Sequence, residues 1–164
     1  MTDVAETATG LAEPANDAEV YACLAPELIR FASALVGRDE AADALSAAVV
    51  KALASPTWPS VVNRRAYLYR AVFNEAQTQR RRGWQRTARE SRVVPRPQWD
   101  LPNLDPEVVA AVARLSVRQR AVVVLTYWAD LAPAAVAERL GISEGSVRRH
   151  LARARARLRE VLHA

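Results

Sequence analysis

Apolar residues recur along this chain at the spacing of α-helices. The first predicted helix begins near Val20, and its apolar face is formed by Leu24, Leu28, Phe31 and Leu35. Intervals of three and four residues bring such side chains to one side of a helix. Gly37 stands where this helix would end, and Asp39 is suited to cap the next one. The second helix would end before the proline-containing turn at 55–59, and its apolar face consists of Leu45, Val49 and Leu53.

The pattern predicts five further helices. The third runs from about residue 63 to 82, with Leu68, Val72 and Phe73 as its candidate core residues. Residues 85–105 contain several prolines and have no period, which predicts a linker. Asp105 and Pro106 then provide a helix start. Helices are predicted at about 106–114, 116–129, 133–140 and 144–162.

Together these elements predict an all-α fold of two small helical domains joined by a flexible linker. The N-terminal domain would span residues 19–84, the linker 85–105 and the C-terminal domain 106–164. Residues 1–18 are acidic, small and aperiodic, so they are predicted to be disordered.

The strongest local pattern is a helix-turn-helix at residues 134–151. Its first helix would direct Val136, Ala137 and Leu140 inward. Gly141 permits a left-handed turn, Ile142 would fill the space between the helices, and Ser143 is a good N-cap. The second helix has a single apolar stripe, formed by Val147, Leu151, Ala154, Leu158 and Val161. In this motif the second helix enters the major groove of DNA.

Arginines cover the side of that second helix opposite its apolar stripe. Such a face is suited to phosphate contacts, while the first residues of the helix lie nearest the base edges. The predicted DNA-binding residues are therefore Ser146, Arg148, Arg149, His150 and Arg153. The alternative is a solvated basic face on a packing helix, which the glycine turn, the cap and the stripe in register make the weaker interpretation.

The distribution of charge also indicates a polyanionic partner. Residues 1–43 hold nine acidic side chains against two arginines, a net charge of −7, whereas residues 44–164 have a net charge of +12. Lys51 is the single lysine among 23 basic residues, and arginine suits bidentate contacts with phosphate and guanine. The alternative interpretation is a GC-rich genome, which encodes arginine and alanine often and would explain much of the same skew.

Several classes of protein are disfavoured by the sequence. The single cysteine, Cys23, excludes an internal disulfide and a cysteine-cluster zinc site. No glycine-rich phosphate loop, paired histidine ligands or nucleophile motif appears, so we expect no enzyme activity, no cofactor and no metal. The first residues lack the features of a signal peptide, and no apolar run approaches the roughly 20 residues of a membrane helix. A cytoplasmic protein without membrane insertion is therefore predicted.

The C-terminal half resembles region 4 of the bacterial sigma-70 family, best matched by its extracytoplasmic-function (ECF) group. The resemblance lies in the run from Leu115 to Trp128, the helix-turn-helix, and the run from Arg153 to Leu158. It implies that this half recognises the promoter −35 element and contacts the flap of the polymerase β subunit.

The N-terminal half resembles region 2 of the same family. Residues 65–74, continuing into Arg80, Arg81 and Arg82, look like the helix that melts and holds the −10 element. Aromatic rings offer stacking faces to unpaired bases and arginines follow the backbone. The predicted −10 residues are Trp58, Tyr67, Tyr69, Asn74, Gln77, Arg80 and Arg81, and Trp84 offers a further stacking face.

The resemblance also implies partners. In the family, the second helix carries an Asp-Leu-Val-Gln-Glu-like run that docks on the polymerase β′ subunit, and here the segment is Asp43-Ala-Leu-Ser-Ala47. The predicted polymerase-binding residues are Asp43, Leu45, Ser46 and Val49. The expected partners are core RNA polymerase through its β and β′ subunits, promoter DNA, and an anti-sigma factor.

Two other interpretations stay open. The run from Ser146 to Leu151 also resembles the recognition helix of LuxR-type activators, although such a regulator would not need the aromatic and arginine-rich helix before the linker. A sigma-like protein acting as a repressor or adaptor is kept open by the altered 43–47 segment. Cys23 is interpreted either as a redox sensor or as a small core residue, the commoner role for a lone thiol.

Overall fold

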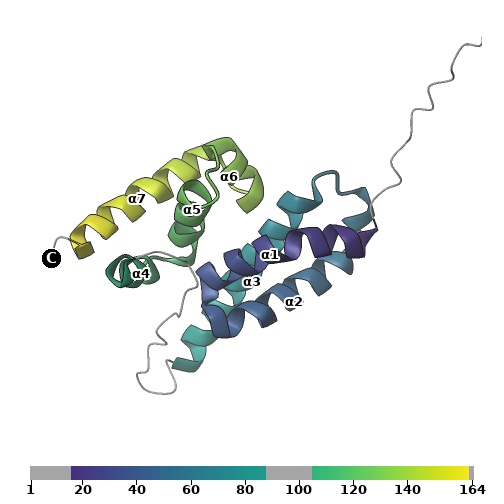
Figure 1. The fold of residues 1–164 in the computed structure, drawn as a ribbon, viewed down its shortest axis with the longest axis horizontal. Helices are drawn as coiled ribbons and strands as arrows, with labels where there is room; N and C mark the ends of the chain where they lie inside the picture. The colour runs from purple at the N-terminus through teal and green to yellow at the C-terminus, as the bar shows by residue number, and fades with distance from the viewer. Residues whose placement is uncertain (1–15, 88–104, 163–164) are drawn as a thin grey trace, which may run out of the picture.

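The computed structural model describes residues 16–87 and 105–162, and all regular structure within them is helical (Figure 1). The N-terminal half contains α1 (Asp17–Val36), α2 (Arg38–Leu53), a short 3-10 turn η1 (Trp58–Ser60) and α3 (Arg64–Thr87). The C-terminal half contains α4 (Pro106–Ala113), α5 (Val117–Tyr127), α6 (Pro133–Leu140) and α7 (Glu144–Leu162). The predicted all-α class is confirmed. Residues 17 and 18, predicted to be disordered, lie in the first turn of α1, and residues 85–87, predicted to be linker, lie in α3. The rest of the predicted disordered segment up to residue 15, and of the predicted linker up to residue 104, lies outside the described residues.

The N-terminal helices begin close to where the sequence predicts. Asn16 caps α1, because its side-chain oxygen accepts a hydrogen bond from the backbone N–H of Ala18 at 3.3 Å. Gly37, with φ of 94°, ends α1 as predicted. Gly37 is also the residue directly before α2, so the prediction of Asp39 as the cap is wrong. Asp39 lies instead in the first turn of α2, where a carboxylate interacts favourably with the positive end of the helix dipole.

The C-terminal helices are capped as the sequence indicates. The Asp105 side chain accepts a hydrogen bond from the N–H of Glu107 at 2.8 Å, with Pro106 in the first turn of α4. Ser116 and Gln119 form a reciprocal capping box at the start of α5. These local bonds satisfy backbone groups that a helix leaves unpaired at its N-terminus.

Gly141 forms the turn between α6 and α7 with a left-handed backbone, at φ of 65°. We expect Gly141→Ala to lower the free energy of unfolding by about 1–2 kcal/mol, since L-residues resist this conformation. A Cβ atom here would also lie 2.7 Å from Nε of Arg70, so that side chain would have to move. Urea denaturation measures the loss. Gly145→Ala is the control, because its Cβ would meet nothing closer than 3.9 Å and it lies inside a helix; equal effects at both glycines would contradict the strain argument.

One apolar core is shared by helices of both halves. Its fully buried members include Leu28 and Leu35 of α1, Leu68 and Val72 of α3, Val122 and Leu125 of α5, and Val136 of α6. A smaller cluster joins α4, α5 and α7 through Val112, Val123 and Ala154, together with Leu115 of the intervening turn. The division into two domains stays a prediction, since the two halves pack as a continuous body in this arrangement.

The two halves meet mainly along two helix pairs. Figure 1 shows α5 and α6 against the α1–α3 bundle, and the contacts between elements place α6 along α3 and α5 along α1. α7 packs on α5 and α6, and also on α4. As a result, the helix-turn-helix is anchored to the N-terminal helices as well as to its own core.

A buried arginine lies at this junction. Arg120 of α5 has only 1% of its surface exposed, and its guanidinium donates hydrogen bonds to three backbone carbonyls. They are Leu35 O at 2.6 Å, Ala113 O at 2.6 Å and Leu115 O at 3.1 Å. Burial, and then the charge of Arg80, lower the pKa of Arg120 to about 10, so it stays a cation at neutral pH. Sequence inspection did not single out this residue.

Candidate nucleic-acid interface

The helix-turn-helix has the geometry that its sequence predicts. Val136, Ala137 and Leu140 of α6 are buried, as are Val147 and Ala154 of α7. The remaining apolar positions of α7 are half-buried: Leu151, Leu158 and Val161. Ser143 caps α7 by accepting a hydrogen bond from the N–H of Ser146 at 3.2 Å. The rigid support of α7 fixes the direction in which its polar face points.

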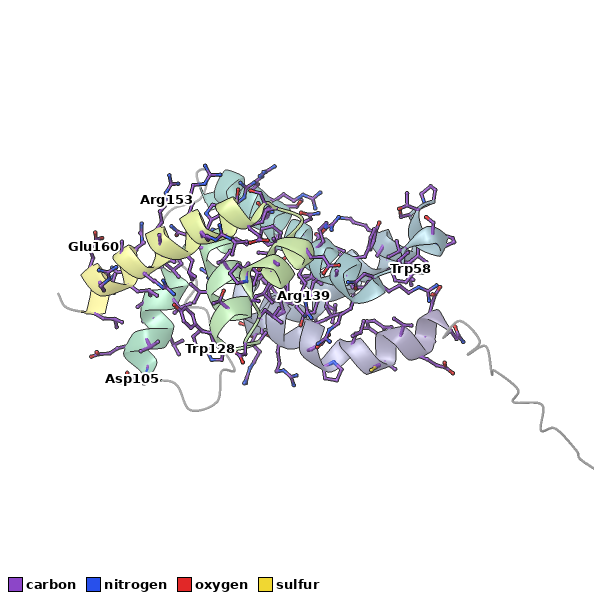
Figure 2. All side chains as sticks on the ribbon, turned by 90° about the horizontal axis from the view of Figure 1, so that it is seen from above. Trp58, Asp105, Trp128, Arg139, Arg153 and Glu160 are labelled. Carbon is purple, nitrogen blue, oxygen red and sulfur yellow. The ribbon has the colours of Figure 1, made fainter. Side chains whose placement is uncertain are left out.

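The basic residues of α7 that we predict to bind DNA lie on its outer side. Arg148, Arg149 and Arg153 are exposed, and Figure 2 shows Arg153 projecting away from the body of the molecule. Arg149 donates a hydrogen bond to Oγ of Ser146 at 3.0 Å. Arg148 forms an ion pair with Glu144, one turn before it, at 2.7 Å. An arginine-rich helix face of this kind is suited to contacting phosphates and base edges.

His150 is half-buried beside this face. Burial lowers its pKa below 6.5, and the nearby charges of Arg118, Arg153 and Arg149 lower it further. The ring is therefore neutral at pH 7 and is available as a neutral hydrogen-bonding group. His150 has its ordinary pKa in the unfolded chain and a lower pKa in the folded protein. As the pH falls, the unfolded chain therefore protonates His150 before the folded protein does, and this lowers the free energy of unfolding.

The predicted −10 residues are distributed unevenly over the surface. Asn74, Arg80 and Arg81 of α3 are exposed, while Tyr67 and Gln77 are half-buried. Trp58 and Tyr69 are each only 4% exposed. The side chain of Trp84 lies outside the described part of the structure.

Neither buried aromatic ring presents a free stacking face here. Trp58 packs edge-on against Tyr67, with 5.7 Å between ring centroids, and Arg64 lies 5.2 Å from its ring. Tyr69 packs against Phe31 at 5.0 Å and is covered by the guanidinium of Arg139 at 4.6 Å. The expectation that these two rings are open to unpaired bases therefore does not hold for this arrangement.

A shallow cavity of about 270 Å³ lies between α2 and α3. Its polar lining includes Lys51 of α2 with Arg70, Asn74 and Glu75 of α3. Glu75 is 5% exposed and forms an ion pair with Lys51. The predicted −10 residue Asn74 thus lies at a recess with positive charge, close to a buried carboxylate whose position the sequence pattern did not predict.

The predicted polymerase-binding residues of α2 fall into two groups. Asp43 and Ser46 are exposed and Val49 is half-buried, whereas Leu45 is 4% exposed and belongs to the core. Leu45 is therefore not available for docking in this structure. Val50 and Leu53, which were not predicted as contacts, are exposed on this helix. An exposed apolar position in a helix is the signal that identifies them.

Three further observations concern other kinds of site. In residues 16–87 and 105–162, no cluster of His, Cys, Asp and Glu is suited to holding a metal ion. No helix in the same residues is long and apolar enough to cross a membrane. Cys23 is exposed on α1, so its interpretation as a small core residue is wrong.

Comparison with known proteins gives a family for the chain. Residues 106–158 match the family model described as "Sigma-70, region 4". The RNA polymerase sigma-E factor of Streptomyces avermitilis is 33% identical over 137 residues, which cover 76% of this chain and 72% of that protein.

Solved structures show the same fold. The sigma factor RpoE of Bartonella quintana, in complex with the anti-sigma factor NepR, matches with a TM-score of 0.67 at 23% identity, over 90% of this chain and 96% of that one. CnrH, in complex with the cytosolic domain of CnrY, matches with a TM-score of 0.60 at 21% identity, over 89% of this chain and 86% of that one. Taken with the sequence matches, these likenesses lead to one conclusion: the chain belongs to the sigma-70 family of RNA polymerase sigma factors, in the ECF group, and has a role in transcription initiation.

Proposed function

We propose that this protein joins core RNA polymerase and recognises promoters by their −10 and −35 elements. The observation that carries the proposal is the exposed arginine face of α7, held by a packed helix-turn-helix within the region that matches sigma-70 region 4. The two modules, residues 19–84 and 106–164, would be joined through residues 85–105. The protein would act in the cytoplasm, without catalysing a reaction itself.

For the −35 element, α7 would lie in the major groove. Arg149 and Ser146, hydrogen-bonded to each other near the start of the helix, would lie nearest the base edges. Arg153, one turn further along, would contact the phosphate backbone.

For the −10 element, the exposed side of α3 would hold the unpaired strand. Arg80 and Arg81 supply positive charge for its phosphates, and Asn74 supplies an amide for a base edge. Tyr67, Gln77, Trp58 and Tyr69 would contribute once they are accessible. Support for this assignment comes from the position of these residues on one helix and on the turn before it.

Polymerase would dock on the exposed side of α2. Asp43, Ser46 and Val49 are the contacts that the sequence predicts, and exposed Val50 and Leu53 extend the same helix face with apolar area. An anti-sigma factor is a further proposed partner, since the similar sigma factor RpoE of Bartonella quintana was solved in complex with the anti-sigma factor NepR.

A second candidate function is favoured by residues 46 and 47. Exposed Ser46 and half-buried Ala47 stand where the family has a polar Gln-Glu pair. Missing polar contacts weaken an interface when the partner's groups stay unpaired. A protein with weakened docking would bind promoters as a sigma-derived regulator without directing polymerase.

Reconstituted run-off transcription separates the two functions. Genomic promoter fragments are transcribed by core polymerase with and without this protein. Promoter-specific transcripts that need the protein are expected. Promoter binding without such transcripts would contradict the sigma function and would favour the second candidate, a sigma-derived regulator.

Restoring the polar pair tests the docking surface. We expect Ser46→Gln combined with Ala47→Glu to tighten binding to core polymerase by about 5- to 10-fold, through contacts worth about 1–1.4 kcal/mol. The affinity is measured with labelled protein and purified core enzyme. Ala156→Glu, on the exposed side of α7, controls for added negative charge. Equal affinities for the wild-type chain and the double variant would show that residues 46 and 47 do not contact polymerase.

A further inference from the structure

His150 of α7 lies at the boundary between the apolar stripe and the basic face of this helix. It comes one turn after Ser146 and directly before Leu151 of the stripe, and its ring is half-buried. Arg153 follows three residues later, and side chains at this spacing are neighbours on a helix surface. Arg149 is exposed and donates a hydrogen bond to Oγ of Ser146 at 3.0 Å. Two arginines and a histidine therefore share one edge of α7.

A third arginine reaches the same edge from another helix. Arg118 of α5 is exposed, and α5 packs along α7. Of the three arginine charges that act on the ring of His150, that of Arg118 has the largest effect. Its Nε atom donates a hydrogen bond to Oε1 of Gln77 at 3.0 Å, which helps to hold the guanidinium in place. The helix-turn-helix pattern did not indicate Arg118, because this residue lies before the motif. We call the four residues the His150 cluster: Arg118, Arg149, His150 and Arg153.

No carboxylate offsets the positive charge of the His150 cluster. Within residues 16–87 and 105–162, none of its three arginines forms an ion pair. On α7 itself, Glu144 is paired with Arg148. Two other helices pack on α7: the charged side chains of α6, Glu138 and Arg139, are directed to α3 and the residue before it, and Glu107 lies in the first turn of α4. Guanidinium groups gathered in this way are suited to binding an anion.

The charge state of His150 depends on such an anion. In the protein alone, burial lowers the pKa of the ring, and repulsion by the three neighbouring guanidinium groups lowers it further. A phosphate beside the ring has the opposite charge and favours the protonated form. Protonated histidine donates hydrogen bonds from both ring nitrogens, so it is also the better phosphate ligand. Phosphate binding and protonation at His150 therefore favour each other.

We propose that the His150 cluster binds a backbone phosphate of the −35 duplex, with Arg118 as an additional contact, and that His150 takes up a proton from the solvent as the phosphate binds. This inference rests on the proposed promoter function. It adds to that function a contact from outside the helix-turn-helix and a dependence on pH. Because the complex holds the proton more firmly than the free protein does, affinity rises as the pH falls and levels off below the pKa of the free ring.

NMR titration of the histidine ring in the full chain measures the proton uptake directly. His163→Gln leaves one histidine signal, since the sequence has two histidines. The titration is carried out on the protein alone and on its complex with a −35 duplex from a promoter that is active in the run-off assay. We expect the pKa of His150 to be higher in the complex than in the free protein. The same pKa in both would overturn the proton uptake.

Substitutions at His150 test the consequence for affinity. By fluorescence anisotropy, the wild-type chain is expected to bind the duplex about fivefold more tightly at pH 6 than at pH 8. His150→Gln is neutral at both values and should keep the weaker affinity throughout, whereas His150→Arg is charged at both and should keep the tighter one. His163→Gln is the matched control and should retain the wild-type dependence. A pH dependence that persists in His150→Gln would overturn the role of His150.

Arg118→Gln tests the contact from α5. Its loss is expected to weaken duplex binding by about fivefold and to lower the slope of log affinity against log salt by about 0.9, the effect of one phosphate contact. Arg159→Gln makes the same change at an exposed position in the last turn of α7 and should alter neither quantity. Equal affinities and slopes for these two variants would overturn the phosphate contact of Arg118.

A duplex of scrambled sequence separates the cluster from the promoter function. Every sequence presents the same backbone phosphates, so both duplexes are expected to show the dependence on pH and on Arg118. Equal affinity for the two duplexes, with these dependences intact, would contradict promoter recognition and support the phosphate cluster alone. Tighter binding to the promoter duplex without these dependences would overturn the cluster and support promoter recognition alone. Binding to neither duplex would overturn both.

Discussion

Arg120→Met is expected to lower the free energy of unfolding by about 3 kcal/mol. The methionine side chain is similar in length but donates no hydrogen bond, so three carbonyls lose their guanidinium donor. An unsatisfied buried polar group costs about 1–3 kcal/mol, and part of this is offset because no cation is then buried. Urea denaturation of the full chain measures the change through the midpoint and the slope.

Two variants make this result specific. Arg120→Lys keeps the charge but replaces the planar fork by a single ammonium group, so an intermediate loss is expected. Arg114→Met removes an exposed arginine from the turn before α5 and should change stability by less than about 0.5 kcal/mol. A midpoint for Arg120→Met equal to that of Arg114→Met would show that the buried guanidinium contributes no net stability.

Arg149→Ala is expected to weaken binding to a −35 duplex by about tenfold. A direct phosphate or base contact contributes about 1–3 kcal/mol, and losing a phosphate contact also lowers the slope of log affinity against log salt by about 1. Fluorescence anisotropy at several salt concentrations measures both quantities, using a duplex taken from a promoter that is active in the run-off assay.

Arg159→Ala is the matched control for this loss of charge. It removes an exposed arginine from the last turn of the same helix, far from the residues expected at the base edges. Arg149→Lys retains the charge and loses the fork, so it should keep the salt slope while losing affinity if Arg149 contacts a base. If Arg149→Ala and Arg159→Ala have the same affinity and the same salt slope, Arg149 does not contact the DNA.

Local signals predicted the helices and their ends well, because each signal acts within a few residues. Gly141 adopts the left-handed turn, Ser143 and Asp105 cap the following helices, and the helix at 133–140 has its predicted bounds. The two residues where a local signal misled were Asp39, which Gly37 precedes as the cap, and Cys23, which is exposed. For the first, the sequence pattern assigned Gly37 to the end of α1 and Asp39 to the start of α2, whereas Gly37 alone separates the two helices.

The candidate site was harder to predict, since its residues also serve as packing residues. Trp58 and Tyr69 have rings suited to stacking on bases, and the same rings fill the core beside Tyr67 and Phe31. Leu45 lies in the segment that resembles a docking motif, yet its side chain points into the bundle. The residue type indicates what a side chain can bind. Whether that side chain packs in the core or contacts DNA or polymerase depends on contacts between segments far apart in the chain.

The burial of Arg120 has a consequence for how such a contact evolves. Three hydrogen-bond acceptors of its guanidinium are main-chain carbonyls, of Leu35, Ala113 and Leu115. Every amino acid supplies the same carbonyl, so a substitution at one of these positions keeps the bond as long as the backbone stays in place. Comparison of related sequences for paired substitutions would therefore find no correlated change at this contact, although it joins residues 85 positions apart. At these three bonds the arginine itself would leave the trace, as a basic residue retained at a position that its neighbours would suggest should be apolar.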